Sequence, residues 1–268
     1  MIRTAIIGAG GRMGRRLVAL TVEDPELELS GAVDAYAAFH GTDAGDLAGV
    51  GCAGVPISES FADVVKKSDA AIDFSAPQGL DKRLALALEH DCALIIGTTG
   101  LTDDQKALIA KTAEQGARIV FAPNMSVGVN LLFNLCAKVA RILGEDYDIE
   151  VVEMHHNQKK DAPSGTAERL GEILAEARDL SYANDTAHGR EGLVGARPKN
   201  EIGMHALRGG DVVGDHTVIF ATPGERVELT HKASSRDTFA KGALRAAKFL
   251  SKAKPGLYDM QDVLGLKD

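Results

Sequence analysis

Tryptophan is absent from this sequence of 268 residues, and aromatic residues account for only 4% of it. Basic residues are in the minority, because 30 Lys and Arg stand against 38 Asp and Glu, which gives a formal net charge of −8. A surface that binds nucleic acid needs a basic stripe, often with aromatic rings on which the bases stack. Neither feature is found in the sequence, so we expect no nucleic-acid partner.

Cysteine is scarce as well, since the sequence has only Cys52, Cys92 and Cys136, far apart and without a Cys-x-x-Cys pair. This pattern predicts reduced thiols rather than a disulfide framework or a zinc site, and no metal is expected. The sequence also has no run of about 18 apolar residues and no signal-peptide pattern before its first strand. We therefore expect no membrane association and a cytoplasmic location.

The first half of the chain alternates short apolar runs with amphipathic segments. Helices are predicted for residues 11–21 and 77–90, and another after Thr102, which forms a capping-box pattern with Gln105. The glycine-rich residues 41–54 are expected to form a long loop. Strands separated by such helical patterns indicate βαβ units and a parallel sheet. The predicted strands are residues 4–7, 27–33, 70–74, 93–96 and 118–122.

The pattern changes in the second half of the chain. Turn-forming glycine and proline separate its last strands, which indicates a mixed or antiparallel sheet. The predicted elements are helices at 128–143, 166–178 and 238–252, strands at 147–154, 201–208, 216–221 and 226–231, and a mobile loop at 178–200. The fold class expected is α/β, with a Rossmann-like parallel-sheet domain (residues 1–126, completed by 236–268) and a smaller α+β domain (residues 127–235).

A glycine-rich turn joins the first predicted strand to the first helix. Its sequence is Gly8-Ala9-Gly10-Gly11-Arg12-Met13-Gly14, and its spacing is Gly8-x-x-Gly11-x-x-Gly14, because Met13 stands where a strict Gly-x-Gly-x-x-Gly motif needs glycine. Small residues allow a close approach to a pyrophosphate at the helix N-terminus. Asp34 ends the second strand about 20 residues after Gly14, where an acid binds the adenosine ribose. Taken alone, the glycines are also compatible with a plain tight turn.

Two further segments follow predicted strands. Ligands of open α/β sheets bind at the carboxyl ends of the strands. We therefore expect both segments to contribute to the dinucleotide site, although each is also compatible with an ordinary turn. The residues concerned are Gly97, Thr98 and Thr99 after the fourth strand and Ala122, Pro123, Asn124 and Met125 after the fifth.

A basic segment interrupts this acidic sequence in the second half. It contains His155, His156, Lys159 and Lys160, and Ser164-Gly165-Thr166 follows just before a predicted helix. A lysine can supply a positive charge and a proton, and a histidine can relay one. The backbone N–H groups at a helix N-terminus suit a carboxylate. The segment predicts a pocket for an anionic substrate; the alternatives are a solvated surface loop or a metal site, for which further ligands are missing nearby.

The segment Glu-x-His-His-x-x-Lys-x-Asp-Ala-Pro-Ser-Gly-Thr-Ala, which begins at Glu153, resembles the signature of the 4-hydroxy-tetrahydrodipicolinate reductase family. Further matches to this family are distributed over nearly the whole chain. They lie at residues 8–14, 72–75, 97–100, 124–130, 214–216 and 230–236.

The resemblance implies an NAD(P)H-dependent oxidoreductase of lysine and diaminopimelate biosynthesis, which reduces a cyclic imine to tetrahydrodipicolinate. It implies a homotetramer, a small dicarboxylate substrate and a second domain that binds this substrate and mediates assembly. His155 is the implied proton donor and acceptor, and Lys159 the implied proton donor. The implied substrate-binding residues are His156, Gly165 and Thr166, and Ser164 is expected to join them because it belongs to the same helix N-terminus. The implied cofactor-binding residues are Gly8, Ala9, Gly10, Gly11, Arg12, Met13, Asp34, Gly97, Thr98, Thr99, Ala122, Pro123, Asn124 and Met125.

The residues around Asp34 predict that NADH is preferred and NADPH is used less well. A carboxylate accepts hydrogen bonds from the ribose hydroxyls but repels a 2′-phosphate. Ala35 follows it where relatives that use both cofactors carry arginine, which leaves Arg12 and His40 as the nearby cations. Two other functions remain open: an NAD-dependent dehydrogenase of aspartate or homoserine, and a non-catalytic NAD-sensing protein. Neither accounts for the His-His-x-x-Lys segment.

Overall fold

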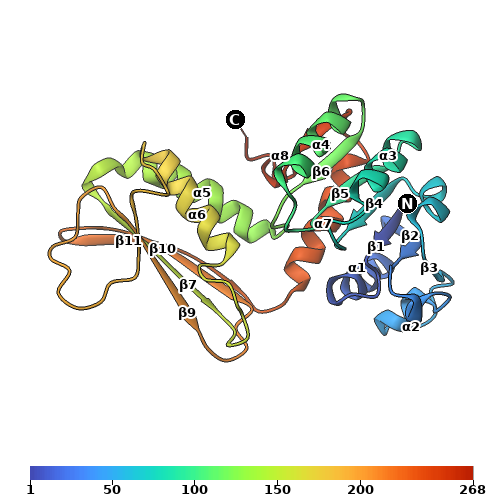
Figure 1. The fold of residues 1–268 in the computed structure, drawn as a ribbon, viewed down its shortest axis with the longest axis horizontal. Helices are drawn as coiled ribbons and strands as arrows, with labels where there is room; N and C mark the ends of the chain where they lie inside the picture. The colour runs from blue at the N-terminus through green and yellow to red at the C-terminus, as the bar shows by residue number, and fades with distance from the viewer. Residues whose placement is uncertain (268) are drawn as a thin grey trace. The chain divides into compact units, whose positions relative to one another are not determined.

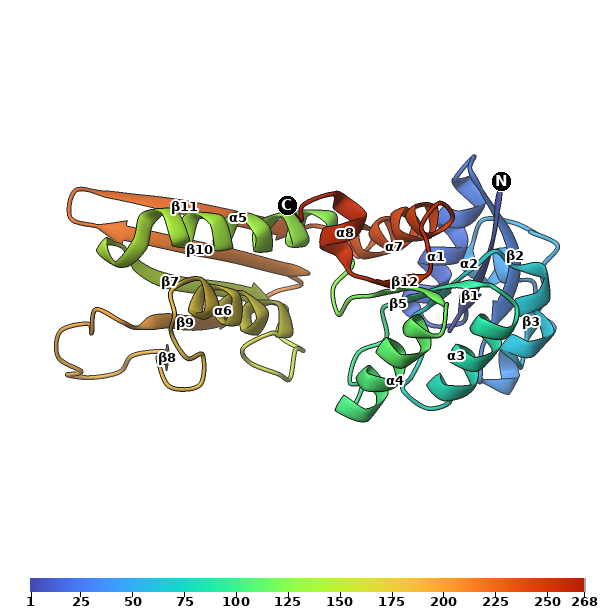
Figure 2. The same ribbon diagram turned by 90° about the horizontal axis from the view of Figure 1, so that it is seen from above.

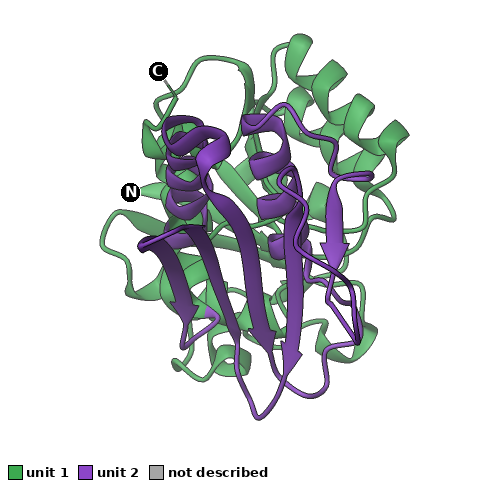
Figure 3. Ribbon diagram, turned by 90° about the vertical axis from the view of Figure 1, so that its left-hand side faces the viewer, with its two compact units in different colours: residues 1–127, 237–268 green, residues 128–236 purple. Residues whose placement is uncertain are grey.

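The computed structural model describes residues 1–267, and the chain divides into two compact units (Figure 3). Unit 1 contains Met1–Val127 and Asp237–Asp268, and unit 2 contains Gly128–Arg236. The chain therefore leaves unit 1, forms the whole of unit 2 and returns to finish unit 1. The last long helix belongs to unit 1.

Unit 1 is built on a sheet of seven strands, all parallel to their neighbours, in the order β12-β6-β5-β4-β1-β2-β3 (Figure 1). Every residue of β4 and β5 is buried, which explains why these strands are continuous apolar runs rather than alternating ones. The strands are β1 (Ile2–Ile7), β2 (Leu27–Val33), β3 (Ile57–Ser58), β4 (Ala70–Asp73), β5 (Ala93–Ile96), β6 (Arg118–Phe121) and β12 (Gly256–Tyr258).

Helices cover both faces of this sheet, as Figure 2 shows. One core cluster packs Ile6, Ile72 and Ile95 against α1 and α7, and the other packs Ala71 and Leu94 against α3 and α4. Successive strand residues point to opposite faces, so β1, β2, β4, β5 and β6 each contribute to both clusters. The helices are α1 (Arg12–Glu23), α2 (Ala44–Ala48), α3 (Leu80–Glu89), α4 (Asp103–Glu114), α7 (Asp237–Leu250) and α8 (Met260–Leu264), with short 3₁₀ turns η1 (Ala37–Phe39), η2 (Phe61–Asp63) and η3 (Val65–Lys67).

Unit 2 contains a mixed sheet in the order β11-β10-β7-β9-β8. β7 is antiparallel to β10 and parallel to β9, while β10 and β11 form an antiparallel hairpin. Two helices pack on one face of the sheet, where Ile149 and Val151 of β7 join the core (Figure 1). The elements are α5 (Val127–Leu143), η4 (Gly144–Asp146), β7 (Asp148–His155), α6 (Gly165–Ala177), β8 (Thr186–His188), β9 (Ile202–Arg208), β10 (Gly214–Thr222) and β11 (Glu225–Ala233).

The predicted fold class, a Rossmann-like parallel-sheet domain beside a smaller mixed-sheet domain, is confirmed. The predicted capping box is also present, because Thr102 Oγ1 accepts a hydrogen bond from Gln105 N–H and the Gln105 side chain accepts one from Thr102 N–H. This reciprocal pair starts α4 at the expected residue.

Some sequence predictions were wrong or incomplete. The predicted loop over residues 41–54 contains the helix α2, whose N-cap is Asp43. The predicted mobile loop over residues 178–200 contains the strand β8, which pairs with β9. β3, β12 and α8 were not predicted from the sequence. β3 and β12 are only two and three residues long, and such short strands carry no periodic signal.

α5 and the residues after it, Val127–Asp146, form a helix that is long and apolar enough to cross a membrane, by length and composition only. The apolar composition of α5 is explained by its place in the core of unit 2. Leu132, Phe133 and Cys136 of this helix are buried in the core against the sheet, and Lys138 and Arg141 lie among its exposed residues. The core helix of a folded domain meets the same length and composition test.

Candidate active site: a glycine loop in unit 1 and a basic loop in unit 2

The turn between β1 and α1 requires glycine at two positions. Gly8 has a φ of +83°, and a Cβ there would lie 2.6 Å from the carbonyl oxygen of Phe74. A Cβ at Gly14 would lie 2.0 Å from the carbonyl oxygen of Gly8. The backbone therefore turns tightly and α1 packs closely against it, which leaves the N–H groups at the start of α1 available to an anion.

Asp34, at the end of β2, lies beside this loop. Its carboxylate accepts hydrogen bonds from Gly10 N–H (2.8 Å) and from Tyr36 N–H (2.9 Å). A cavity of about 910 Å³ opens here. Its lining includes Gly8, Gly11, Asp34, Ala35, Lys82 and Arg83. A cavity with a glycine turn on one side and a strand-end carboxylate on another fits the adenosine half of a dinucleotide.

Further cations lie near this cavity besides Arg12 and His40, which the sequence suggested. Arg12 is exposed, and His40 Nε2 contacts the backbone oxygen of Asp34 rather than its carboxylate. Arg15 instead donates from Nε to the Gly10 carbonyl (2.9 Å) and stacks on the Phe39 ring. Lys82 of α3 lines the cavity itself. Neither Arg15 nor Lys82 could be found from the sequence, because nothing local reveals which face of a helix meets the ligand.

The other expected cofactor segments follow β5 and β6 at the same edge of the parallel sheet. Thr98 is buried and hydrogen-bonds Asp73, while a Cβ at Gly97 would collide with the Phe74 ring. Met125 is buried against α7, since a Cβ at Gly242 would lie 1.7 Å from its carbonyl oxygen. Gly97, Thr98 and Met125 thus fix the backbone at the carboxyl edge of the parallel sheet. Ala9 and Ala122 are buried, Met13 and Asn124 are half-buried, and Pro123 is exposed.

Asp73, for which the sequence predicts no role, lies at the edge of the cavity-lining turn. It is fully buried at the end of β4, and its carboxylate accepts from Arg83 Nε at 2.7 Å and from the backbone N–H of Ser75 at 3.1 Å. Arg83 also donates to the carbonyls of Ala76 and Gln78. A buried ion pair with this many donors holds the 75–79 turn beside the cavity.

In unit 2, His155 ends β7 and is held by a buried carboxylate. Its Nδ1 lies 2.6 Å from Glu153 Oε2, and Glu153 is only 1% exposed. Glu153 also accepts from Ser164 N–H at 3.1 Å and from both terminal nitrogens of Arg208 at 2.9 Å. Burial alone would raise the pKa of Glu153, but the hydrogen bonds from Arg208 and His155 outweigh it and lower that pKa. The carboxylate is therefore ionised.

Ser164 begins α6 and joins the helix to a second buried histidine. Its Oγ accepts from Ala167 N–H as an N-cap (3.2 Å) and lies 3.1 Å from Nε2 of His216. The His216 and His155 rings meet edge to face, with centroids 5.2 Å apart. Burial, and then the neighbouring His155, lower the pKa of His216 to about 4. His216 is therefore neutral, and its Nε2 shares a hydrogen bond with the Ser164 hydroxyl.

The remaining predicted site residues of unit 2 lie around the start of α6. Lys159 Nζ pairs with Asp161 Oδ2 at 2.8 Å, and the Lys159 side chain is 20% exposed. His156 and Thr166 are half-buried. Gly165 is the exposed first residue of α6, and a Cβ there would meet no atom within 4 Å. Gly165 thus keeps the helix N-terminus open to a carboxylate, although no neighbouring atom enforces glycine there.

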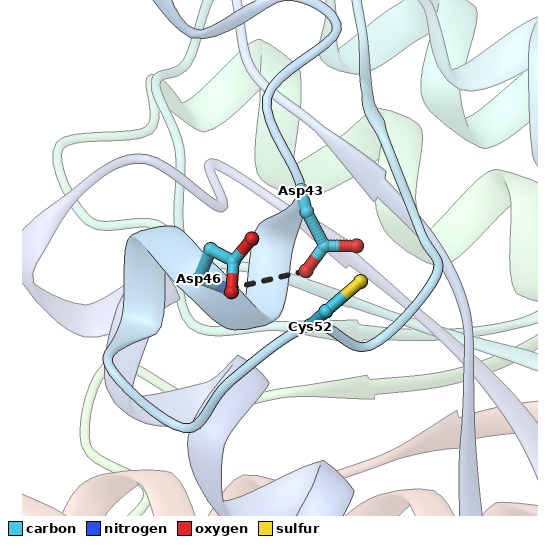
Figure 4. Close-up of side chains that lie close together, drawn as sticks. All are labelled: Asp43, Asp46 and Cys52. Atoms are coloured by element: carbon cyan, nitrogen blue, oxygen red, sulfur yellow. Dashed lines mark hydrogen bonds between the residues drawn. The ribbon is translucent and has the colours of Figure 1, made fainter.

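One group of side chains in unit 1 has the spacing of metal ligands: Asp43, Asp46 and Cys52 (Figure 4). The Asp43 carboxylate, however, already accepts four backbone hydrogen bonds, from Gly45, Asp46, Ala53 and Val55. Those bonds, first the one from Ala53, lower its pKa to about 2. Asp43 thus ties the start of α2 to the chain after it, and this structural role accounts for the cluster.

Comparisons with known proteins agree over both units. The family model "Dihydrodipicolinate reductase, N-terminus" matches residues 2–125, and "Dihydrodipicolinate reductase, C-terminus" matches residues 128–264. The chain belongs to the dihydrodipicolinate reductase family. It is 53% identical to the 4-hydroxy-tetrahydrodipicolinate reductase of Hahella chejuensis over 100% of both chains. It is 52% identical to that of Pseudomonas fluorescens over 99% of this chain and 100% of the relative.

Solved structures agree with this assignment to the dihydrodipicolinate reductase family. A dipicolinate-bound dihydrodipicolinate reductase from Paenisporosarcina sp. TG-14 superposes with a TM-score of 0.77 at 26% identity, covering 98% of each chain. An aspartate dehydrogenase from Thermotoga maritima reaches a TM-score of 0.51 at 12% identity, covering 93% of this chain and 97% of that one. That weaker likeness concerns the fold alone, so the amino-acid dehydrogenase alternative is not favoured.

Proposed function

We propose that this chain reduces 4-hydroxy-tetrahydrodipicolinate to tetrahydrodipicolinate with NADH or NADPH, in lysine and diaminopimelate biosynthesis. The observation that carries the proposal is the arrangement around α6. A carboxylate-held histidine, His155, and a lysine, Lys159, lie by an open helix N-terminus that begins at Gly165. This combination suits an anionic substrate that must also receive a proton.

The bound nicotinamide supplies the hydride, and the chain's own residues supply binding and proton transfer. Lys159 provides a cation for a carboxylate and a proton for the reduced ring. His155 exchanges protons, and its ring is held by Glu153. His156, Gly165 and Thr166 bind the two carboxylates, with backbone N–H groups of the first turn of α6 and the positive end of the helix dipole contributing. Ser164, expected to join them, instead holds the start of α6, because its N–H donates to Glu153 and its buried hydroxyl contacts Ala167 and His216.

The cofactor residues in unit 1 support a preference for NADH. Gly8 and Gly14 permit the close approach of a pyrophosphate, and Asp34 is available to the ribose hydroxyls. The Asp34 carboxylate opposes a 2′-phosphate, and Lys82 in the same cavity lining partly offsets it. We therefore infer that NADPH is used, but less well than NADH. The other residues of the proposed cofactor site are those given above for the loops after β1, β5 and β6.

We further propose that the protein is a homotetramer assembled through the sheet of unit 2. The face opposite α5 and α6 carries apolar side chains that unit 2 leaves half-buried or exposed, at positions 152, 154, 207, 219 and 221. Pairing two such faces would remove this apolar area from water. Light scattering of Ile219→Lys should show a smaller particle than wild type. Ile142→Lys, on the exposed side of α5, serves as the control; equal masses for all three proteins would contradict the proposed interface.

A cytoplasmic location completes the proposal. Cys92 and Cys136 are buried free thiols, and burial raises the pKa of each to about 12, so neither is a reactive thiolate. A chain with free thiols and no disulfide among its three cysteines suits a reducing compartment. Fractionation of the source cells with an antibody against the chain tests the location, and recovery in the membrane or extracellular fraction would reject it.

One coupled assay tests the reaction itself. Aspartate semialdehyde and pyruvate are mixed with the preceding synthase, this protein and either NADH or NADPH, and the loss of absorbance of the reduced cofactor is followed. We expect cofactor oxidation that depends on the synthase. Omitting the synthase removes the substrate and serves as the control. Oxidation of aspartate or homoserine with NAD⁺, and no reaction in the coupled mixture, would instead support the amino-acid dehydrogenase alternative.

A further inference from the structure

Ser164, Arg208 and His155 contact the Glu153 carboxylate through four hydrogen bonds. Of these three residues, only His155 can act either as a donor or as an acceptor. Oε1 accepts from Ser164 N–H and from Arg208 Nη2, and Oε2 accepts from Arg208 Nη1 and faces His155 Nδ1. A backbone N–H and a guanidinium are always donors, whereas a neutral imidazole carries its proton on either nitrogen. Because Glu153 is an ionised acceptor, the proton of neutral His155 must be on Nδ1.

This assignment leaves Nε2 as the nitrogen of His155 that gains and loses a proton. The ring has space on that side because residue 214 is glycine. A Cβ at Gly214 would lie 3.0 Å from His155 Nε2 and 3.5 Å from its Cδ2. The other groups that face the ring are His216 of β10, which is neutral, and Arg208 of β9, whose charge is matched by Glu153.

We propose that Glu153, held in place by Arg208, is a positioning residue that fixes the tautomer and orientation of His155, so that Nε2 beside Gly214 is its proton-transfer atom. The inference rests on the proposed role of His155 in the reaction. The Glu153–His155 pair is separate from Lys159, whose own partner is Asp161. Glu153 acts through the imidazole and does not itself meet the substrate.

The effect of replacing Glu153 by glutamine follows from the number of donors that face each oxygen of the carboxylate. A glutamine NH₂ in the position of Oε1 would face two fixed donors, Ser164 N–H and Arg208. In the position of Oε2 it would face one fixed donor and His155, which can adapt by becoming an acceptor at Nδ1. Glu153→Gln should therefore move the proton of neutral His155 from Nδ1 to Nε2, because unpaired buried donors are costly.

The experiment reads the tautomer directly. Long-range ¹H–¹⁵N spectra of histidine-labelled protein, without substrate and at a pH where the ring is neutral, distinguish the two forms. The His155 signal is assigned by its loss in His155→Asn. We expect Nδ1–H in wild type and Nε2–H in Glu153→Gln, with kcat lowered ~10²-fold and KM for the substrate little changed. Glu153→Asp keeps an ionised acceptor, so it should keep Nδ1–H and recover part of kcat.

A matched control lies on the opposite face of the same strand. Glu150 also accepts from arginines and holds a histidine, with His205 Nε2 at 2.6 Å from its Oε2. Glu150→Gln removes a similar carboxylate without touching His155. It should leave the His155 spectrum and kcat as in wild type. Gly214→Ala should keep Nδ1–H but lower kcat, because its methyl group crowds Nε2.

Nε2–H in the wild-type spectrum would overturn the proposal, whatever the variants do. A folded Glu153→Gln protein that keeps both Nδ1–H and the wild-type kcat would also overturn it and leave Glu153 a purely structural role. If Glu153→Gln does not fold, the tautomer of His155 in wild type and the kcat of Gly214→Ala still test the proposal. Failure of the proposed reaction is seen separately, as an inactive wild type in the coupled assay, because the tautomer is measured without substrate.

Discussion

Lys159 Nζ lies 2.8 Å from Asp161 Oδ2, so the lysine that we propose as a proton donor is already paired with a carboxylate. The Asp161 side chain is 62% exposed, and its pKa is lowered first by the hydrogen bond from Lys159. Because water screens the exposed Asp161 carboxylate, the pair is worth no more than about 1 kcal/mol. A substrate carboxylate can therefore replace Asp161 at little cost.

Removing this lysine tests its role. Lys159→Ala should lower kcat by about 10²–10⁴-fold, the usual contribution of a positioned acid, with the fold unchanged. KM for the substrate should also rise, because a cation for its carboxylate is lost. Lys160→Ala, which removes the exposed neighbouring lysine, is the matched control and should behave as wild type. If folded Lys159→Ala retains more than about half of the wild-type kcat, Lys159 is not the acid.

The cofactor preference depends on the residue after Asp34. Ala35→Arg should raise kcat/KM for NADPH about tenfold, which corresponds to one charge-assisted contact of about 1.5 kcal/mol with the 2′-phosphate. The measurement is kcat/KM for both cofactors at fixed substrate and ionic strength. Ala37→Arg places the same charge on an exposed residue outside the cavity lining and controls for net charge. A wild type that favours NADPH would show that Lys82 or Arg15 outweighs Asp34.

The buried His216 should make stability depend on pH. Its pKa is lowered to about 4 from a usual value of 6.5, first by burial and then by His155. Between these values the unfolded chain binds a proton that the folded chain does not, so stability rises with pH over this window and is lost as the pH falls. At about 1.4 kcal/mol per unit, the loss between pH 7 and pH 4 is about 3 kcal/mol.

Urea unfolding at a series of pH values measures this slope. His216→Asn should flatten the pH dependence of the unfolding free energy between about pH 6.5 and pH 4, even if it lowers the free energy at neutral pH. His188→Asn, at an exposed position in β8, should leave the slope as it is in wild type. An unchanged slope in His216→Asn would mean that this histidine is protonated in the folded protein.

The Asp43 cluster should not respond to metals. Its carboxylate oxygens are occupied by four backbone N–H donors, so zinc or magnesium would have to displace them. We expect EDTA and added metal ions to leave the thermal midpoint and activity unchanged. Asp43→Asn should lower the midpoint, because an amide offers one acceptor oxygen instead of two, whereas Asp46→Asn should not. A metal-dependent rise in the midpoint of wild type, lost in Asp43→Asn, would establish a metal site.

The parts predicted well from the sequence are those whose signal is local. The β1–α1 turn is recognisable because Gly8, Gly11 and Gly14 lie between an apolar run and an amphipathic one. The capping box at Thr102 depends on two residues three apart. The Asp43 N-cap of α2 was also a local signal, but the surrounding glycines obscured it, and the segment was predicted as a loop.

The environment of His155 could not be predicted in the same way, because its partners come from distant strands. Arg208 is 55 residues from Glu153, and His216 is 52 residues from Ser164. They meet only because β9 runs parallel to β7 with His155 beside Arg208, and β10 runs antiparallel to β7 with His216 beside Glu153. The register of a sheet is a tertiary property, so the sequence pattern could single out His155 as a candidate but could not reveal the groups that orient it.

The order of the strands in unit 1 has a consequence for how the protein is made. α7 covers β4, β5 and β6, and β12 pairs with β6, yet both elements follow the whole of unit 2 in the chain. While unit 2 is synthesised on the ribosome, the first six strands therefore lack the helix that covers β4, β5 and β6 on the face they share with α1. Unit 2 is continuous in sequence and can fold during that interval. A nascent chain stalled before Asp237 should accordingly recruit chaperones to its N-terminal half, and release of residues 237–258 should end that association.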